Sequence, residues 1–188
     1  ASITKMMTAY VVLKDKPLQP GQSGPVIELT AKDAQRWLEM LAQDQSSLPV
    51  AAGQRLTELQ LLEGLLVPSA NNYAEILAAW DAGSVSAFVQ KMNAEAQALG
   101  MKDTTFWPTA EQIERLAKSY RTRSDGKGLE ETGISFLRGD LTSRARTPFP
   151  AGGLFSTAAD LARFYRAILL GGELDGARIV SRAAIEEM

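Results

Sequence analysis

The sequence contains neither histidine nor cysteine in its 188 residues. The chain therefore cannot form a Ser-His-Asp triad, a cysteine nucleophile, a disulfide, or a metal site built on imidazole or thiolate. A catalytic base has to come from Lys, Asp, Glu or Tyr, and composition leaves open only a Mg²⁺ or Ca²⁺ site held by carboxylates. Positive charge is not in excess either, since 20 Lys and Arg stand against 22 Asp and Glu. The net charge of −2 gives no electrostatic reason to bind nucleic acid or an anionic membrane.

Long apolar runs are also missing. No stretch approaches the ~20 apolar residues that span a bilayer, and no signal peptide is visible. The first residues already have the pattern of an amphipathic helix, and residues 181–188 have the pattern of a capped helix. Both ends therefore look cut, and we expect a fragment. Hydrophobic residues make up 45% of the chain, which is enough to form the core of one compact domain.

The periodicity of the apolar residues predicts a mainly α protein with few short strands. Thr30 and Thr57 have the pattern of helix N-caps, and Gly100 has the pattern of a residue that ends a helix. In residues 122–152 the apolar residues follow neither a helical nor a strand period. Residues 26–30 are a strand candidate, and helices are expected over residues 2–14, 31–42, 57–67, 71–80, 84–99, 110–121 and 157–170.

Two short motifs carry the candidate chemistry. The first is Ser2-Ile3-Thr4-Lys5, an S-x-x-K pattern that places a hydroxyl and an amine one helical turn apart on the same face. A lysine in a desolvated pocket has a lowered pKa and can accept the serine proton, which replaces the missing histidine. The alternative is a serine that caps a helix next to a solvated lysine.

The second motif is Pro68-Ser69-Ala70-Asn71, at the bend between two predicted helices. A hydroxyl and a carboxamide presented from such a bend can relay a proton and hold a substrate amide. The alternative is that Ser69 only caps the helix that follows.

Together, the motifs and their separation resemble those of the serine D-alanyl-D-alanine carboxypeptidases, the low-molecular-weight penicillin-binding proteins. The likeness covers residues 1–106 and is carried mainly by residues 1–10 and 66–74. It implies that Ser2 is the acylated nucleophile and Lys5 its base, while Ser69 and Asn71 assist proton transfer and substrate positioning. It also implies a D-Ala-D-Ala peptide or β-lactam as substrate, an extracytoplasmic location, and no cofactor or metal.

Residues 107–188 resemble a different branch of the superfamily, the class C β-lactamases and esterase-type hydrolases. The likeness is carried by residues 149–164 and by Gly171-Gly172-Glu173-Leu174-Asp175-Gly176. A change of branch near residues 100–106 suggests a chimera of the segments 1–106 and 107–188. A single divergent family is the alternative, and the second branch would make small esters the substrate.

The third motif of both branches, Lys-Thr-Gly on a strand of the sheet, does not occur in these 188 residues; the nearest string is Glu131-Thr132-Gly133. The resemblance then implies the helical lobe of the β-lactamase and penicillin-binding-protein fold, with its central sheet largely missing. Without that strand we expect Lys5 to stay solvated near its ordinary pKa, and the chain to be a poor catalyst. A non-catalytic helical module and a plain interaction domain remain the competing functions.

Overall fold

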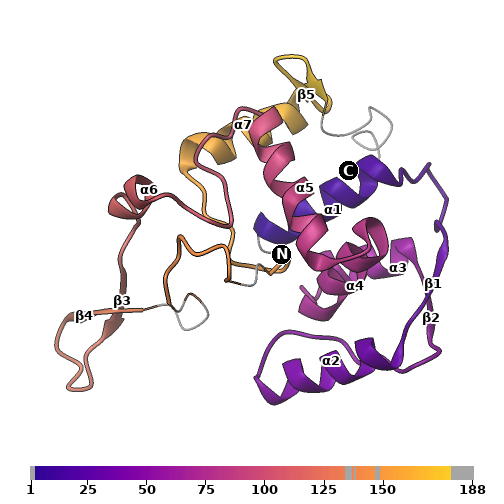
Figure 1. Ribbon diagram of the computed structural model, residues 1–188, viewed down its shortest axis with the longest axis horizontal. Coiled ribbons are helices and arrows are strands. Elements are labelled where there is room, and N and C mark those ends of the chain that lie inside the picture. Colours follow the sequence, from indigo (N-terminus) through magenta and orange to yellow (C-terminus); the bar gives the residue numbers. More distant parts are fainter. Residues whose placement is uncertain (1–2, 134–136, 138, 147–148, 179–188) are drawn as a thin grey trace.

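The fold is arranged around its first helix. In the computed structural model, residues 3–133, 137, 139–146 and 149–178 are described. Figure 1 shows α1 in the middle of the molecule, with the later elements placed around it. The elements are α1 (Ile3–Asp15), β1 (Val26–Glu28), α2 (Ala31–Ala42), β2 (Arg55–Thr57), α3 (Glu58–Leu66), α4 (Asn71–Ala82), α5 (Val85–Ala98), α6 (Ala110–Glu114), β3 (Ser119–Thr122), β4 (Leu129–Thr132), α7 (Ala158–Leu169), β5 (Glu173–Leu174) and β6 (Ala177–Arg178).

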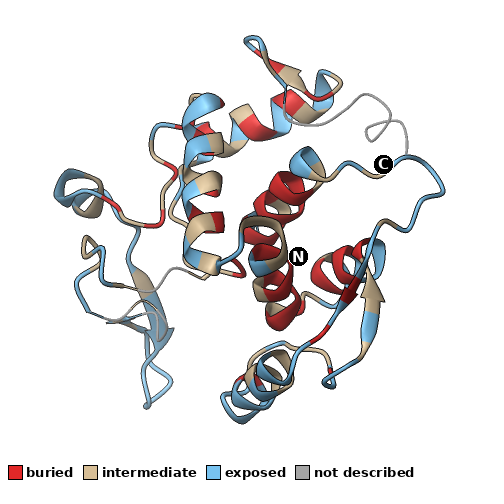
Figure 2. Ribbon diagram, turned by 45° about the vertical axis from the view of Figure 1, so that its right-hand side comes forward, coloured by how far each residue is buried: buried red, intermediate tan, exposed pale blue. Residues whose placement is uncertain are grey.

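Helix α1 is buried along most of its length because α3, α4 and α5 pack against it. Figure 2 shows the buried residues concentrated in these central helices. α1 is apolar on nearly every side, as expected for a helix inside a core. The largest fully buried side chains come from several elements and include Leu29, Met40, Leu61, Leu65, Leu77, Phe88, Met92, Leu99, Met101 and Phe106.

The predicted helix ends are confirmed where they rest on capping chemistry. The Thr57 hydroxyl accepts a hydrogen bond from the backbone N–H of Gln60 at 3.2 Å, and the Gln60 side chain accepts one from the N–H of Thr57 at 2.9 Å. Thr30 makes the same reciprocal arrangement at the start of α2. Gly100 follows α5 with a φ of +67°, a left-handed conformation that costs glycine little. Local side-chain chemistry therefore sets these boundaries.

The predicted fold class, mainly α with few short strands, is confirmed. The strands that the described residues form pair into three separate two-stranded antiparallel sheets, β1–β2, β3–β4 and β5–β6. No helix in that part of the chain is long and apolar enough to cross a membrane. The prediction of a helix over 181–188 lies outside the described residues.

The predicted helix over residues 110–121 is wrong. Helix α6 ends at Glu114, and residues 119–122 form β3, which pairs with β4 inside the segment 122–152 that shows no apolar period. The apolar residues on the supposed helical face find little to pack on, since Leu116 is 41% exposed and Tyr120 is 55% exposed. A helix of this length gains its stability mainly from packing, so the hairpin forms instead. Strand β2 was also missed.

The segment after α5 returns to α1 and α5. The Asp160 carboxylate, at the start of α7, accepts hydrogen bonds from the Thr104 hydroxyl at 2.7 Å and from the Asp103 backbone N–H at 2.8 Å. The Tyr10 ring of α1 meets the Phe164 ring of α7 edge-on, with ring centroids 6.3 Å apart. These contacts join the two halves of the chain through buried groups.

Candidate active site

Lys5 of α1 and Asn71 of α4 meet although 66 residues separate them. The Lys5 Nζ donates a hydrogen bond to the Asn71 Oδ1 at 2.7 Å. Lys5 is only 3% exposed, so the expectation that it stays solvated is wrong. Lys5 lies on a helix that packs among α3, α4 and α5, and its amine meets Asn71 of α4. Burial lowers the pKa of Lys5 below its ordinary value because the ammonium form loses its hydration.

Asn71 is held from two directions. It is the first residue of α4, and its backbone N–H donates to the carbonyl of Ser46 at 2.8 Å. Its side-chain Nδ2 donates to the Oε1 of Gln45 at 3.2 Å. Because one end of the carboxamide is bound to Gln45, the oxygen at the other end is directed to Lys5. The loop before β2 therefore fixes the orientation of Asn71.

Ser69 lies at the corner between α3 and α4. Its φ of +63° is left-handed, a conformation that is uncommon and costly for a residue other than glycine. The corner is held on both sides, because the Ala70 N–H donates to the Gly64 carbonyl at 3.0 Å and the Ser46 hydroxyl donates to the Pro68 carbonyl at 3.1 Å. Backbone strain of this kind concentrates at functional sites.

Ser2 lies outside the described residues, which begin with Ile3 at the start of α1. Of the four predicted site residues, the structure therefore brings together Lys5 and Asn71 and places Ser69 two residues before Asn71. Convergence of all four in one site stays a prediction. Among the described residues no group of three or more Asp or Glu side chains is placed to hold a metal ion.

Two supporting residues were not predicted from the sequence, Gln45 and Asn72. Asn72 is 1% exposed, and its amide forms a closed pair of bonds with Leu48: Nδ2 donates to the Leu48 carbonyl at 2.8 Å and Oδ1 accepts from the Leu48 N–H at 3.1 Å. These bonds attach the loop that carries Gln45 to α4. The sequence offers only a weak signal for Asn72, because it follows Asn71 directly and its burial is visible only in the structure.

Glu131-Thr132-Gly133, the string most like the third motif, lies at the exposed β3–β4 hairpin. Thr132 ends β4, and the Glu131 carboxylate accepts a hydrogen bond from the Lys118 ammonium at 2.8 Å on the exposed β3–β4 hairpin. Figure 1 shows this hairpin projecting from the body of the molecule. The position of this string on the hairpin therefore gives no support to a role like that of Lys-Thr-Gly.

The chain is similar to known proteins over most of its length. A family model for D-alanyl-D-alanine carboxypeptidases (peptidase S11) matches residues 1–180. A D-alanyl-D-alanine carboxypeptidase of Bacillus subtilis is 31% identical over 107 residues, which is 56% of this chain and 25% of the relative. A D-alanyl-D-alanine endopeptidase of Pseudomonas aeruginosa is 36% identical over 107 residues, which is 56% of this chain and 31% of that protein. The chain thus spans a quarter to a third of these relatives.

Solved structures show the same relationship. Penicillin-binding protein 6B of Escherichia coli matches with a TM-score of 0.57 and 27% identity, over 90% of this chain and 42% of that one. The D-alanyl-D-alanine carboxypeptidase of Mycobacterium tuberculosis matches with a TM-score of 0.53 and 26% identity, over 90% of this chain and 46% of that one. The class C resemblance of residues 107–188 stays a prediction. With the family match extending over residues 1–180, this chain belongs to the D-alanyl-D-alanine carboxypeptidase family.

Proposed function

We propose that this chain carries the acylation machinery of a serine hydrolase that acts on D-Ala-D-Ala peptides and on β-lactams. The Ser2 Oγ attacks the carbonyl carbon of the terminal peptide bond while the neutral Lys5 amine takes the hydroxyl proton. The C–N bond then breaks, the departing D-alanine nitrogen receives that proton, and an acyl-Ser2 ester remains. Water hydrolyses the ester and regenerates the serine. With a β-lactam, the same attack opens the ring and leaves the acyl group attached.

The observation that carries the proposal is the hydrogen bond, 2.7 Å long, from the buried Lys5 to Asn71. An amine must be neutral before it can accept a proton. The burial of Lys5 lowers its pKa and so favours the neutral amine. The bond to Asn71 also fixes the position of the amine at the corner where Ser69 lies. In this proposal Ser69 relays the proton to the leaving group, and the Asn71 carboxamide positions the substrate amide.

The substrate class and the location belong to the proposal as well. The family match and the D-Ala-D-Ala names of the relatives support a cell-wall peptide as the partner. With such a substrate, the proposal also includes an extracytoplasmic location. Small esters are the alternative substrate, on the resemblance of residues 107–188 to esterase-type hydrolases.

The test is covalent labelling of the 188-residue chain by a fluorescent penicillin, followed by intact-mass and peptide-mass analysis. We expect one acyl group per chain, attached to Ser2, and none on the Ser2→Ala variant. Lys5→Met should lower the acylation rate by about 10²-fold or more, the usual contribution of a general base. Lys5→Arg should lower it similarly, because a guanidinium is not deprotonated in proteins.

Matched controls separate the base from charge effects. Lys14 lies on the same helix as Lys5 and is exposed, so Lys14→Met should leave the rate unchanged. The rate should rise with pH through the lowered pKa of Lys5. Labelling that persists in Ser2→Ala refutes the proposal. A folded chain that never labels, while a known family enzyme labels under the same conditions, favours a non-catalytic module.

A further inference from the structure

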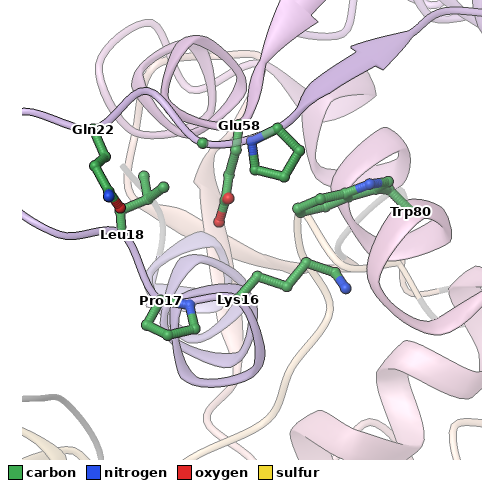
Figure 3. A pocket seen from close by; sticks show the side chains of 8 residues that line it. Lys16, Pro17, Leu18, Gln22, Glu58 and Trp80 are labelled. Carbon is green, nitrogen blue, oxygen red and sulfur yellow. The ribbon is translucent and has the colours of Figure 1, made fainter.

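A pocket of about 470 Å³ opens between the end of α1, the loop that follows it, and the helices α3 and α4. None of its lining residues belongs to the proposed catalytic set. Figure 3 shows the Glu58 carboxylate pointing into the space enclosed by the other side chains. The walls are mostly apolar, and the labelled lining residues are Lys16, Pro17, Leu18, Gln22, Glu58 and Trp80.

The Glu58 carboxylate is buried without a partner. Glu58 is 0% exposed, and neither carboxylate oxygen has a hydrogen bond to any described residue. Burial raises the pKa of Glu58 to about 7, with Asp81 adding to the rise and Lys16 opposing it. Leaving a buried polar group without a hydrogen bond costs stability. A hydrogen-bond donor from a bound molecule would remove this cost.

The loop above the carboxylate is shaped around it. At Gly24 a Cβ atom would come within 2.6 Å of the Glu58 Oε2, which is closer than real Cβ contacts allow. The φ of +71° at Gly24 also favours glycine. The absence of a side chain here lets the loop approach the carboxylate closely while adding no donor to it. The loop therefore covers the carboxylate, whose two buried oxygens keep no hydrogen-bond donor among the described residues.

The opposite wall already attracts a cation. The Lys16 ammonium lies over the Trp80 ring, 4.8 Å from its centroid, in the geometry of a cation–π contact. Asp81, the next residue on α4, keeps one buried oxygen without a partner among the described residues, while its other oxygen accepts a 2.7 Å hydrogen bond from Lys91. Among the residues that line the pocket, Glu58 supplies the carboxylate, Trp80 the aromatic face and Lys16 the cation.

We propose that this pocket binds a primary ammonium group carried on an aliphatic chain. The ammonium donates hydrogen bonds to the Glu58 oxygens and lies against the Trp80 ring in place of Lys16, while the aliphatic chain contacts Pro17 and Leu18. A primary ammonium has three N–H donors, and only a donor satisfies the carboxylate. A quaternary ammonium would gain the ring contact alone. The ammonium can come from a free alkylamine or from the lysine side chain of a peptide.

The experiment is a titration of the 188-residue chain, followed by the ¹H–¹⁵N signal of the Trp80 indole. The probes are n-butylammonium chloride, Nα-acetyl-lysine methylamide and tetramethylammonium chloride at constant ionic strength. We expect saturable shifts with the two primary amines, and the tighter of them identifies the source. Glu58→Gln should weaken this binding about tenfold or more, the effect of losing a charged hydrogen bond. Glu63→Gln, an exposed residue of the same helix, should leave it unchanged.

A second variant keeps the proposal testable if Glu58→Gln fails to fold. Lys16→Met removes the competing ammonium, so it should tighten the binding of both primary amines. Binding should also be tighter at pH 8 than at pH 6, since Glu58 is ionised only above its pKa of about 7. The proposal is overturned if no primary amine produces a saturable shift, if tetramethylammonium binds as tightly, or if the Lys16→Met variant binds more weakly.

Discussion

Changing the pH across the titration of Glu58 should change the stability of the whole chain. The pKa of Glu58 is raised in the folded state from 4.5 to about 7, chiefly by burial. The folded state therefore binds more protons than the unfolded state between these two values, and its stability falls as the pH rises through this window. Below pH 4.5 the contribution of Glu58 is fully present, and above pH 7 it is lost.

The size of the effect follows from the pKa difference. Each pKa unit corresponds to 1.36 kcal/mol, so a rise from 4.5 to about 7 corresponds to about 3 kcal/mol of unfolding free energy. Glu58 is fully buried, so solvent screening reduces this figure little. The placement of Glu58 at the start of α3, where the helix dipole favours the charged form, opposes the rise in part.

Urea unfolding of the wild-type chain, Glu58→Gln and Glu63→Gln at several pH values between 4.5 and 8 measures this contribution. The stability of the wild type relative to Glu58→Gln should decrease by about 3 kcal/mol across the range. The stability of the wild type relative to Glu63→Gln should stay nearly constant, because Glu63 is exposed. A wild-type to Glu58→Gln difference that is independent of pH would refute the reasoning, since it would mean that Glu58 titrates alike in both states.

Two further substitutions test groups that hold the site and the junction in place. Asn72→Ala should lower the unfolding free energy by about 2–4 kcal/mol in urea titrations, because it leaves the N–H and the carbonyl of Leu48 unpaired. Gln97→Ala on the exposed face of α5 should change it by less than about 0.5 kcal/mol, and an equal effect of the two would contradict the argument. Asp160→Ala should cost about 2–3 kcal/mol and raise the hydrogen-exchange rate of the Asp103 amide, which loses its acceptor; unchanged exchange would speak against it.

The parts of the fold that follow from local chemistry could be predicted from the sequence. The helix that starts at Thr57 was predicted from a threonine and a glutamine three residues apart, and the structure shows both reciprocal hydrogen bonds. The hairpin of β3 and β4 could not be predicted in this way. The apolar spacing of residues 110–121 is helical, but Tyr120 stays more than half exposed. Whether a packing surface exists for such a helix is a property of the tertiary structure.

The candidate site, too, could be predicted from the sequence only in part. The motifs pointed to Lys5 and Asn71 because their residue types suit the chemistry, and the structure joins them by a hydrogen bond. The burial of Lys5 could not be predicted, because the sequence motif does not show which helices pack around α1. Gln45 was missed for a similar reason. It lies in a polar loop with no motif, and its contact with Asn71 arises only when that loop attaches to α4 through Asn72.

The position of α1 at the centre has a consequence for biosynthesis. The Thr8 hydroxyl donates to the carbonyl of Pro150, 142 residues further along the chain, and Tyr10 packs against Phe164. A ribosome adds about 5–20 residues per second, so roughly eight to thirty seconds pass between the synthesis of α1 and that of its neighbours in α7. During that interval its apolar surface is incompletely covered, so nascent chains that stop before α7 are the ones we expect chaperones to bind.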